Sequence, residues 1–160
     1  MMALAVVGIA ASFAVTLGAT AERRDAERHL LFVGGEFERA LVAYSASARR
    51  GPRELTELLR DPRFPGVRRH LRQIYADPLT GSTTWGLVRD REGFIIAVYS
   101  LARGTPIRRT GFEPGQETFA DADDYAGWRF GLPIAKAVLV RPGSVTAASS
   151  PASGGWPRQP

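Results

Sequence analysis

The first 21 residues carry no charged side chain, and the chain turns strongly charged from Glu22 onward without a proline or a turn cluster at the change. The uncharged run has about the length that a helix needs to span a bilayer, roughly 20 residues. Every residue between Gly18 and Gly34 tolerates a helix. We therefore expect one helix to continue from the apolar run into the charged stretch. Two helices separated by a kink near Gly18 remain the alternative.

The end of the apolar run also allows an interpretation as a signal peptide. Ala19, Thr20 and Ala21 fit the small-x-small pattern that precedes a cleavage site. No Lys or Arg precedes the apolar stretch, so the basic region of a signal peptide is missing. A soluble periplasmic binding domain released after Ala21 therefore stays open as an alternative to the continuous helix.

Residues 22–48 have the pattern of an amphipathic helix. Apolar side chains recur there at spacings of three and four, which places them on one helical face: Leu30, Val33, Phe37, Leu41 and Tyr44. We expect this face to pack on a sheet, against Trp85, Leu87, Ile96 and Val98. The spacing also predicts surface pairs between Arg23 and Glu27 and between Asp25 and Arg28. The helix is expected to end before Gly51.

Beyond the helix, the sequence predicts short elements separated by turns. Short helices are expected over 52–60 and 67–74, and Asp77 with Pro78 breaks the chain after them. Residues 85–89 and 94–101 are predicted strands, joined by the turn 90–93. Residues 105–109, which include a proline, are predicted as an edge strand. Three aromatic residues are expected to anchor the following loop: Tyr125, Trp128 and Phe130.

These elements predict an α+β, pilin-like fold, in which a long N-terminal helix packs on a small antiparallel sheet. The first half of that helix, residues 1–21, is predicted to span a membrane, and residues 22–48 continue it as an amphipathic helix. Residues 49–141 form the globular α+β domain. Residues 142–160 are rich in Pro, Gly, Ser and Ala, so they are predicted to be a disordered tail.

The charge of the chain is basic, and it comes almost entirely from arginine. The formal net charge is +5, and 20 of the 21 basic residues are Arg. Such a balance suits anionic partners. Eight Arg stand against three acids over 49–72, and the acidic loop 113–124 is a natural partner for them, on this chain or a neighbouring one. We expect contact with a neighbouring subunit, or with membrane lipid, and no nucleic acid, from Arg49, Arg50, Arg53, Arg68, Arg69 and Arg72.

The sequence offers little for catalysis or metal binding. It contains no Cys, which excludes disulfides and thiolate zinc sites, and only two His, His29 and His70, both expected on the surface. It has neither a Gly-x-Ser-x-Gly motif nor a phosphate-binding glycine loop. We predict no catalytic residue and no cofactor site. Calcium at Asp121, Asp123 and Asp124 is the lesser alternative to a solvated acidic loop, because three carboxylates supply only part of a calcium shell.

Five strings in order resemble the type II secretion pseudopilins, relatives of the major, G-type pseudopilin within the type IV pilin superfamily. They are "LLFVGGEFERAL", "DPRFPGVRRHLRQIYADPLTG", "WGLVRDREGFIIAVYSL", "TPIRRTGF" and "YAGWRF". The resemblance covers residue 22 to about residue 130. It implies a structural subunit, not an enzyme, that sits as a single-pass protein in the bacterial inner membrane with its globular domain in the periplasm. Such subunits assemble into a periplasmic fibre with other pseudopilins, through a secretion platform in the inner membrane.

The chain departs from that family at its beginning. Prepilins carry a basic leader and a Gly-Phe-Thr-Leu-x-Glu motif ahead of the apolar run, and the sequence begins inside that run. Leader cleavage and the docking Glu are therefore assigned to no residue. The stretch 102–112 contains no acid, which also argues against the calcium site of the G-type family. A DNA-uptake pseudopilin is a further alternative function.

Overall fold

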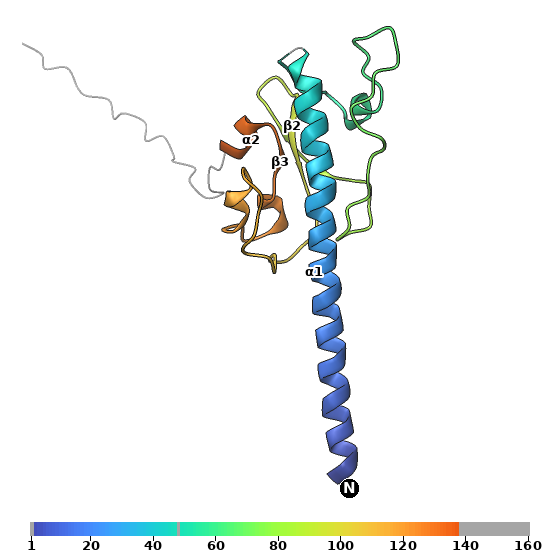
Figure 1. Cartoon of the computed structure of the whole chain (residues 1–160), viewed down its shortest axis with the longest axis vertical. Helices are drawn as coiled ribbons and strands as arrows, with labels where there is room; N and C mark the ends of the chain where they lie inside the picture. Colours follow the sequence, from blue (N-terminus) through green and yellow to red (C-terminus); the bar gives the residue numbers. More distant parts are fainter. Residues whose placement is uncertain (1, 48, 138–160) are drawn as a thin grey trace, which may run out of the picture.

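The computed structural model of the chain describes residues 2–47 and 49–137, with side chains from residue 19 to residue 135. Its longest element is a helix, α1 (Met2–Ala46), and a small sheet packs against the C-terminal half of that helix (Figure 1). The remaining elements are short. They are η1 (Leu55–Leu58), β1 (Gly86–Arg89), β2 (Ile95–Tyr99), η2 (Glu117–Phe119), η3 (Tyr125–Gly127), β3 (Phe130–Gly131) and α2 (Pro133–Ala137).

Helix α1 is a single helix, as the sequence predicts, and its N-terminal half projects away from the sheet (Figure 1). The helix continues through Gly34 and Gly35, although each glycine costs roughly 1 kcal/mol of helix stability relative to Ala. A packing contact explains the first of them. A Cβ at position 34 would lie 2.4 Å from ring atoms of Phe130, so the absence of a side chain lets β3 approach the helix.

The sheet has three antiparallel strands in the order β1-β2-β3. Strands β1 and β2 confirm the predicted hairpin, and the α+β arrangement of a long helix on a small antiparallel sheet is confirmed with them. The predicted edge strand at 105–109 is wrong. The third strand is instead Phe130–Gly131, which pairs Gly131 with Ala97 and Phe130 with Val98. The amides of Ile107 and Arg108 bond to a side chain of α1 and not to the sheet.

The main core lies between α1 and the sheet. All five residues of the predicted helix face are at most 3% exposed: Leu30, Val33, Phe37, Leu41 and Tyr44. The Phe37 ring lies 5.0 Å from Trp85 and 6.3 Å from Tyr75, measured between ring centres. Leu87 and Val98 belong to this core. Ile96 does not, contrary to the prediction, because it packs in a second cluster with Ala97 and Ala135 on the other side of the sheet.

The three predicted aromatic anchors are all buried. Tyr125, Trp128 and Phe130 are at most 1% exposed, and Phe119 joins them. The ring of Trp128 stacks on Phe119 at 5.7 Å, and its indole Nε1 donates to the Phe119 carbonyl oxygen at 3.1 Å. This aromatic cluster holds the segment 117–130 against the sheet without a long element of secondary structure.

The segment 67–74 forms no helix, contrary to the prediction. Its backbone bonds run to another segment: the amides of His70 and Leu71 both donate to the carbonyl oxygen of Leu58, and the carbonyl oxygen of Arg68 accepts from the Asp61 amide. The apolar spacing at 67–74 is therefore outweighed by long-range backbone bonding. The turn predicted at Asp77 is present, and the Asp77 carbonyl oxygen accepts from the amides of Thr80 and Gly81.

Among the residues that the structure describes, no helix combines the length and the apolar character that crossing a bilayer requires. This finding overturns the predicted single-pass location in the inner membrane. Most of the side chains of the run 1–21, to which the membrane-spanning prediction referred, lie outside the described residues. The predicted tail 142–160 lies outside them as well.

Candidate interaction surface

The outer face of α1 carries exposed apolar side chains. Phe32 is 59% exposed and Val42 is 46% exposed, although both lie on the helix that supplies the core. Phe32, Gly35, Arg39, Val42 and Ala46 follow one another at spacings of three and four, so they form one stripe along the helix. This stripe, here called the outer stripe, is turned away from the buried face.

A groove runs beside the outer stripe. Two adjoining hollows of about 370 and 380 Å³ lie between α1 and the segment 113–116, and both are lined by Gly35, Arg39, Glu113 and Gln116. The groove is open, and α1 lines it with apolar and small residues that alternate with the charged side chains Arg28, Glu38 and Arg39. Its shape and lining suit the face of another helix better than a small molecule, because ligand sites are usually deeper and more enclosed.

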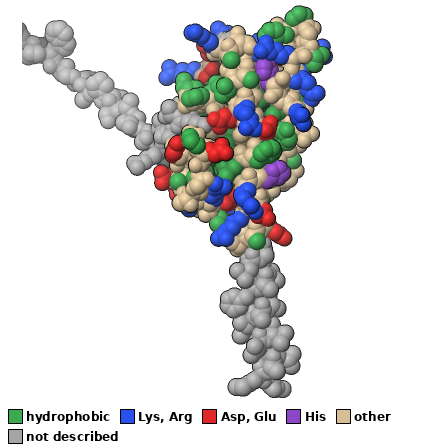
Figure 2. Space-filling model, in the orientation of Figure 1, with side chains coloured by type: hydrophobic (Ala, Val, Ile, Leu, Met, Phe, Trp, Pro, Cys, Tyr) green, Lys and Arg blue, Asp and Glu red, His purple; other side chains and the backbone are tan. Residues whose placement is uncertain are grey.

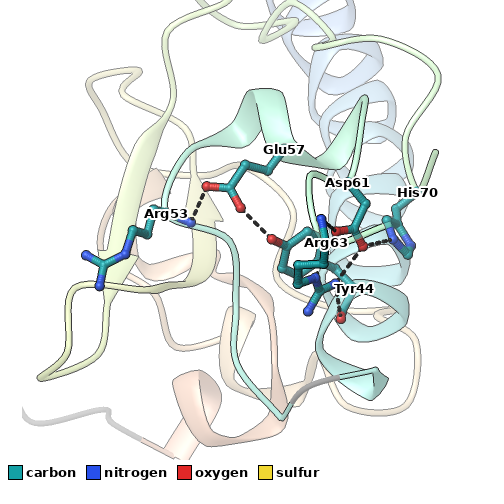
Figure 3. Close-up of polar contacts among 6 residues, drawn as sticks. All are labelled: Tyr44, Arg53, Glu57, Asp61, Arg63 and His70. Atoms are coloured by element: carbon teal, nitrogen blue, oxygen red, sulfur yellow. Dashed lines mark hydrogen bonds and ion pairs between the residues drawn. The ribbon is translucent and has the colours of Figure 1, made fainter. Parts of the chain in front are cut away.

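At the C-terminal end of α1, a buried carboxylate organises the segment that follows (Figure 3). Asp61 is 1% exposed. Its Oδ1 accepts from the Arg63 amide at 3.1 Å and from Arg63 Nε at 2.8 Å, and its Oδ2 accepts from Arg63 Nη2 at 2.6 Å. These hydrogen bonds from the Arg63 side chain hold the pKa of Asp61 far below its usual value.

The same arginine also reaches helix α1. Arg63 Nη2 donates to the carbonyl oxygen of Tyr44 at 2.9 Å, and its guanidinium carbon lies 3.6 Å from the centre of the Tyr44 ring. Tyr44 lies in the last turn of α1, where carbonyl groups lack helical partners and a cation is favourable. Arg63 therefore caps the helix and ties the segment after it to the helix end.

His70 is part of this network, and the expectation that it lies on the surface is wrong. Its side chain is 5% exposed, its Nε2 lies 3.0 Å from Asp61 Oδ2, and its ring packs edge-on against Tyr44 at 5.4 Å. His29, by contrast, is exposed as expected. Asp61 lies 9 residues before His70, and no sequence motif marks the two as partners; the turn between them brings them together.

A second carboxylate supports the start of the same segment. Glu57 Oε1 accepts from the amides of Arg53 and Glu54 at 3.0 and 3.2 Å, and Oε2 accepts from the Tyr44 hydroxyl (Figure 3). Burial and the neighbouring Glu57 raise the pKa of Tyr44. Asp61 and Glu57 thus hold the backbone of the segment after α1 in place by accepting hydrogen bonds from its amides.

The six arginines that the sequence singled out all lie at the surface: Arg49, Arg50, Arg53, Arg68, Arg69 and Arg72. Some lie over aromatic rings. The guanidinium carbons of Arg53 and Arg68 lie 4.7 Å from the Phe94 ring centre and 4.4 Å from the Phe64 ring centre. Such contacts orient the side chains while their charge stays in contact with water.

The acidic segment 113–124 lies on the other side of α1 from the segment 61–75 (Figure 1). Asp121, Asp123 and Asp124 are exposed, and Asp124 Oδ1 accepts from the Gly127 amide at 3.1 Å. Within residues 2–47 and 49–137, no group of three or more acidic or histidine side chains is arranged to hold a metal ion. The structure therefore gives the calcium alternative at these three residues no support.

A third carboxylate, Glu27, was missed as a functional residue by sequence reasoning. It is 1% exposed, and it accepts from the Tyr125 hydroxyl at 2.6 Å and from the amides of Ile107 and Arg108 at 2.7 and 2.9 Å. The predicted Arg23–Glu27 surface pair is wrong. Arg23 Nε instead donates to the Tyr125 hydroxyl at 3.0 Å. Burial, with the hydrogen bond to Glu27, raises the pKa of Tyr125 to about 12.

The other predicted helix pair is present, since Arg28 bonds Asp25 on the surface. One sequence signal distinguishes the buried Glu27 from the residues of this surface pair. Glu27 lies three residues before Leu30, so the apolar periodicity places it on the buried face. That position makes Glu27 a polar contact inside the core that anchors the loop 102–112 to α1.

Comparison of the chain with protein-family models, with curated proteins and with solved structures found no match in any of the three.

Proposed function

We propose that this chain is a structural, pseudopilin-like subunit of a type II protein secretion machine, which assembles into a fibre by packing α1 of successive copies together. The outer stripe of α1 is the observation that carries the proposal. A helix that already supplies the core on one face leaves Phe32 and Val42 exposed on another, beside a groove. Two large apolar side chains exposed on one helix face, with small residues between and beside them, could pack against a second helix, while Arg39 on the same face would have to turn its charge to the edge of that contact.

The arrangement of the elements supports the same proposal. Helix α1 extends well beyond the domain that packs on it (Figure 1). A rod with a domain at one end can stack side by side with further copies, and the small residues Gly35, Ala43 and Ala46 on the outer side would allow a second helix to approach closely. In this proposal the chain acts as a building block of the fibre, through the surfaces by which copies pack on one another.

The proposal is tested on the purified full chain by negative-stain electron microscopy and sedimentation. Val42→Glu places a charge on the outer stripe and is expected to abolish fibres. Leu101→Glu is the matched control, because Leu101 is 48% exposed, close to the 46% of Val42, and lies just after β2. A chain that stays monomeric at all concentrations, or fibres that tolerate Val42→Glu, would contradict the proposal.

A further inference from the structure

Two segments of the chain carry opposite formal charges of equal size. The basic segment, residues 49–72, contains eight Arg and three acids, and the acidic segment, residues 113–124, contains five acids and no Lys or Arg. These counts correspond to formal charges of +5 and −5.

In the structure, the exposed side chains of the basic segment are more positive than its sequence alone indicates. Two of its three acids, Glu57 and Asp61, bond backbone amides, Tyr44 and Arg63, so they face inward. The charge of Arg63 is paired with that of Asp61 in an ion pair. The remaining arginines, Arg68 and its neighbours among them, therefore present their charge outward on a backbone that the buried Asp61 and the half-buried Glu57 hold in place.

The acidic segment presents its charge outward too. Glu113, Asp121 and Asp123 are exposed. Arg109 contacts the backbone of the segment, because its Nη1 donates to the carbonyl oxygens of Ala120 and Ala122 at 3.0 and 2.7 Å. Among the described residues, no ion pair joins Glu113, Asp121 or Asp123 to the basic segment.

Within one copy, α1 separates the later part of the basic segment, residues 61–72, from the acidic segment (Figure 1). The loop that carries Arg68, Arg69 and Arg72 lies on one side of the helix, and the acidic segment lies on the other (Figure 1). In the space-filling view, several basic side chains lie along the upper right-hand edge of the domain and several acidic side chains lie on its left, although both kinds also occur elsewhere on this face (Figure 2). Copies placed side by side would bring opposite charges together.

We infer that the basic segment of one copy docks on the acidic segment of a second copy. The contact is heterologous, because the two surfaces differ, so a docked pair still offers one basic and one acidic segment to which further copies can add. The inference rests on the proposed function and names the partner surfaces that would set the order and orientation of copies in the fibre. Charge complementarity of this kind gives specificity and speed of association more than affinity.

Cysteine cross-linking tests the contact directly, since the natural chain contains no Cys. A full chain that carries both Arg69→Cys and Asp123→Cys is expected to give a ladder of dimer, trimer and larger products with a short bifunctional maleimide. A mixture of the two single variants is expected to stop at the heterodimer. Glu92→Cys, at an exposed turn residue, replaces Asp123→Cys in the control and should give no ladder.

Charge reversal tests the cause of the contact. Replacing Arg68, Arg69 and Arg72 by Glu, or Glu113, Asp121 and Asp123 by Arg, is expected to slow association at low salt roughly tenfold or more. An equimolar mixture of the two reversed chains should restore the rate, because each offers the complement of the other. Association that ignores both reversals, or a mixture that fails to recover, would overturn the inference.

The same experiments separate this inference from the proposed function. Fibres that form normally from both reversed chains would overturn the charged contact and leave packing through α1 intact. The opposite outcome has two parts: the natural chain forms no fibres, and the cross-linked ladder still forms when Val42→Glu is added to the cysteine variants. That outcome would support the charged contact and contradict the proposed fibre.

Discussion

The side of α1 that faces the sheet and the two loops that flank the helix are held in different ways. Against the sheet, the contact is apolar: Phe37 packs on Trp85, and Phe130 packs over Gly34. The loops are held by buried carboxylates of the chain, Glu27 for the loop 102–112 and Asp61 for the segment after η1. One helix thus packs on the sheet through apolar side chains, while its carboxylate Glu27 and the carbonyl group of Tyr44 in its last turn hold the flanking loops through hydrogen bonds.

The largest effect is expected where the apolar contact is removed. Phe37→Ala should lower the free energy of unfolding by about 3–5 kcal/mol, because it deletes a fully buried ring and leaves a cavity. Urea unfolding of the full chain measures this loss. Phe32→Ala is the matched control, since that ring is 59% exposed, and it should cost less than about 1 kcal/mol. Equal losses would show that the two faces of the helix do not differ as described.

Removing the buried charge should have the next largest effect. Asp61→Asn is expected to cost about 2–3 kcal/mol, because Arg63 loses its ionic partner; the 27% exposure of the Arg63 side chain keeps the loss below that of a fully buried pair. Urea unfolding again measures the change. Asp121→Asn removes the same charge from an exposed site and should be nearly neutral. A neutral Asp61→Asn would mean that the carboxylate does not hold the segment.

The same carboxylate predicts how stability depends on pH. The pKa of Asp61 in the folded chain lies below the unfolded value of about 3.9, so the unfolded state binds the proton more readily. Its contribution is complete above the unfolded pKa and is lost as the pH falls toward the folded pKa. We expect the difference in unfolding free energy between the natural chain and Asp61→Asn to shrink between pH 5 and pH 2. A constant difference across that range would contradict this assignment.

The smallest of these effects is expected at Glu27. Glu27→Gln keeps the shape but removes one acceptor, so it should cost about 1–2 kcal/mol and loosen the loop 102–112. Hydrogen exchange should show faster exchange at the amides of Ile107 and Arg108, with the β1–β2 amides unchanged. Glu22→Gln, at an exposed residue of the same helix, should change neither. Unchanged protection at Ile107 would show that Glu27 is not the anchor.

Periodicity predicted the parts of the fold that apolar burial determines. The spacing from Leu30 to Tyr44 predicted the buried face of α1, and β-branched and aromatic residues predicted β1 and β2. These signals are local, because the periodicity and the residue types lie within each element. They can therefore be read from the sequence without knowing which other element it packs against. The long helix on a small antiparallel sheet followed from them.

Polar contacts between distant segments escaped prediction. The segment around Leu71 has helical spacing, yet its backbone bonds Leu58, and the segment around Ile107 was predicted as a strand, yet its amides bond Glu27. His70 was placed at the surface because nothing near it in sequence marks Asp61 as its partner. Each contact joins residues that only the finished fold brings together, and local propensity carries no information about them.

If successive copies pack through α1, the outer stripe becomes buried on assembly, and a nitroxide label at Val42→Cys measures that burial. The chain contains no natural Cys, so the label is unique. We predict that the electron paramagnetic resonance spectrum shows a mobile label in the dissociated chain and an immobilised label in the assembly, whereas a label at Leu101→Cys stays mobile in both. A label at position 42 that remains as mobile in the assembled state as in the dissociated chain would contradict the account.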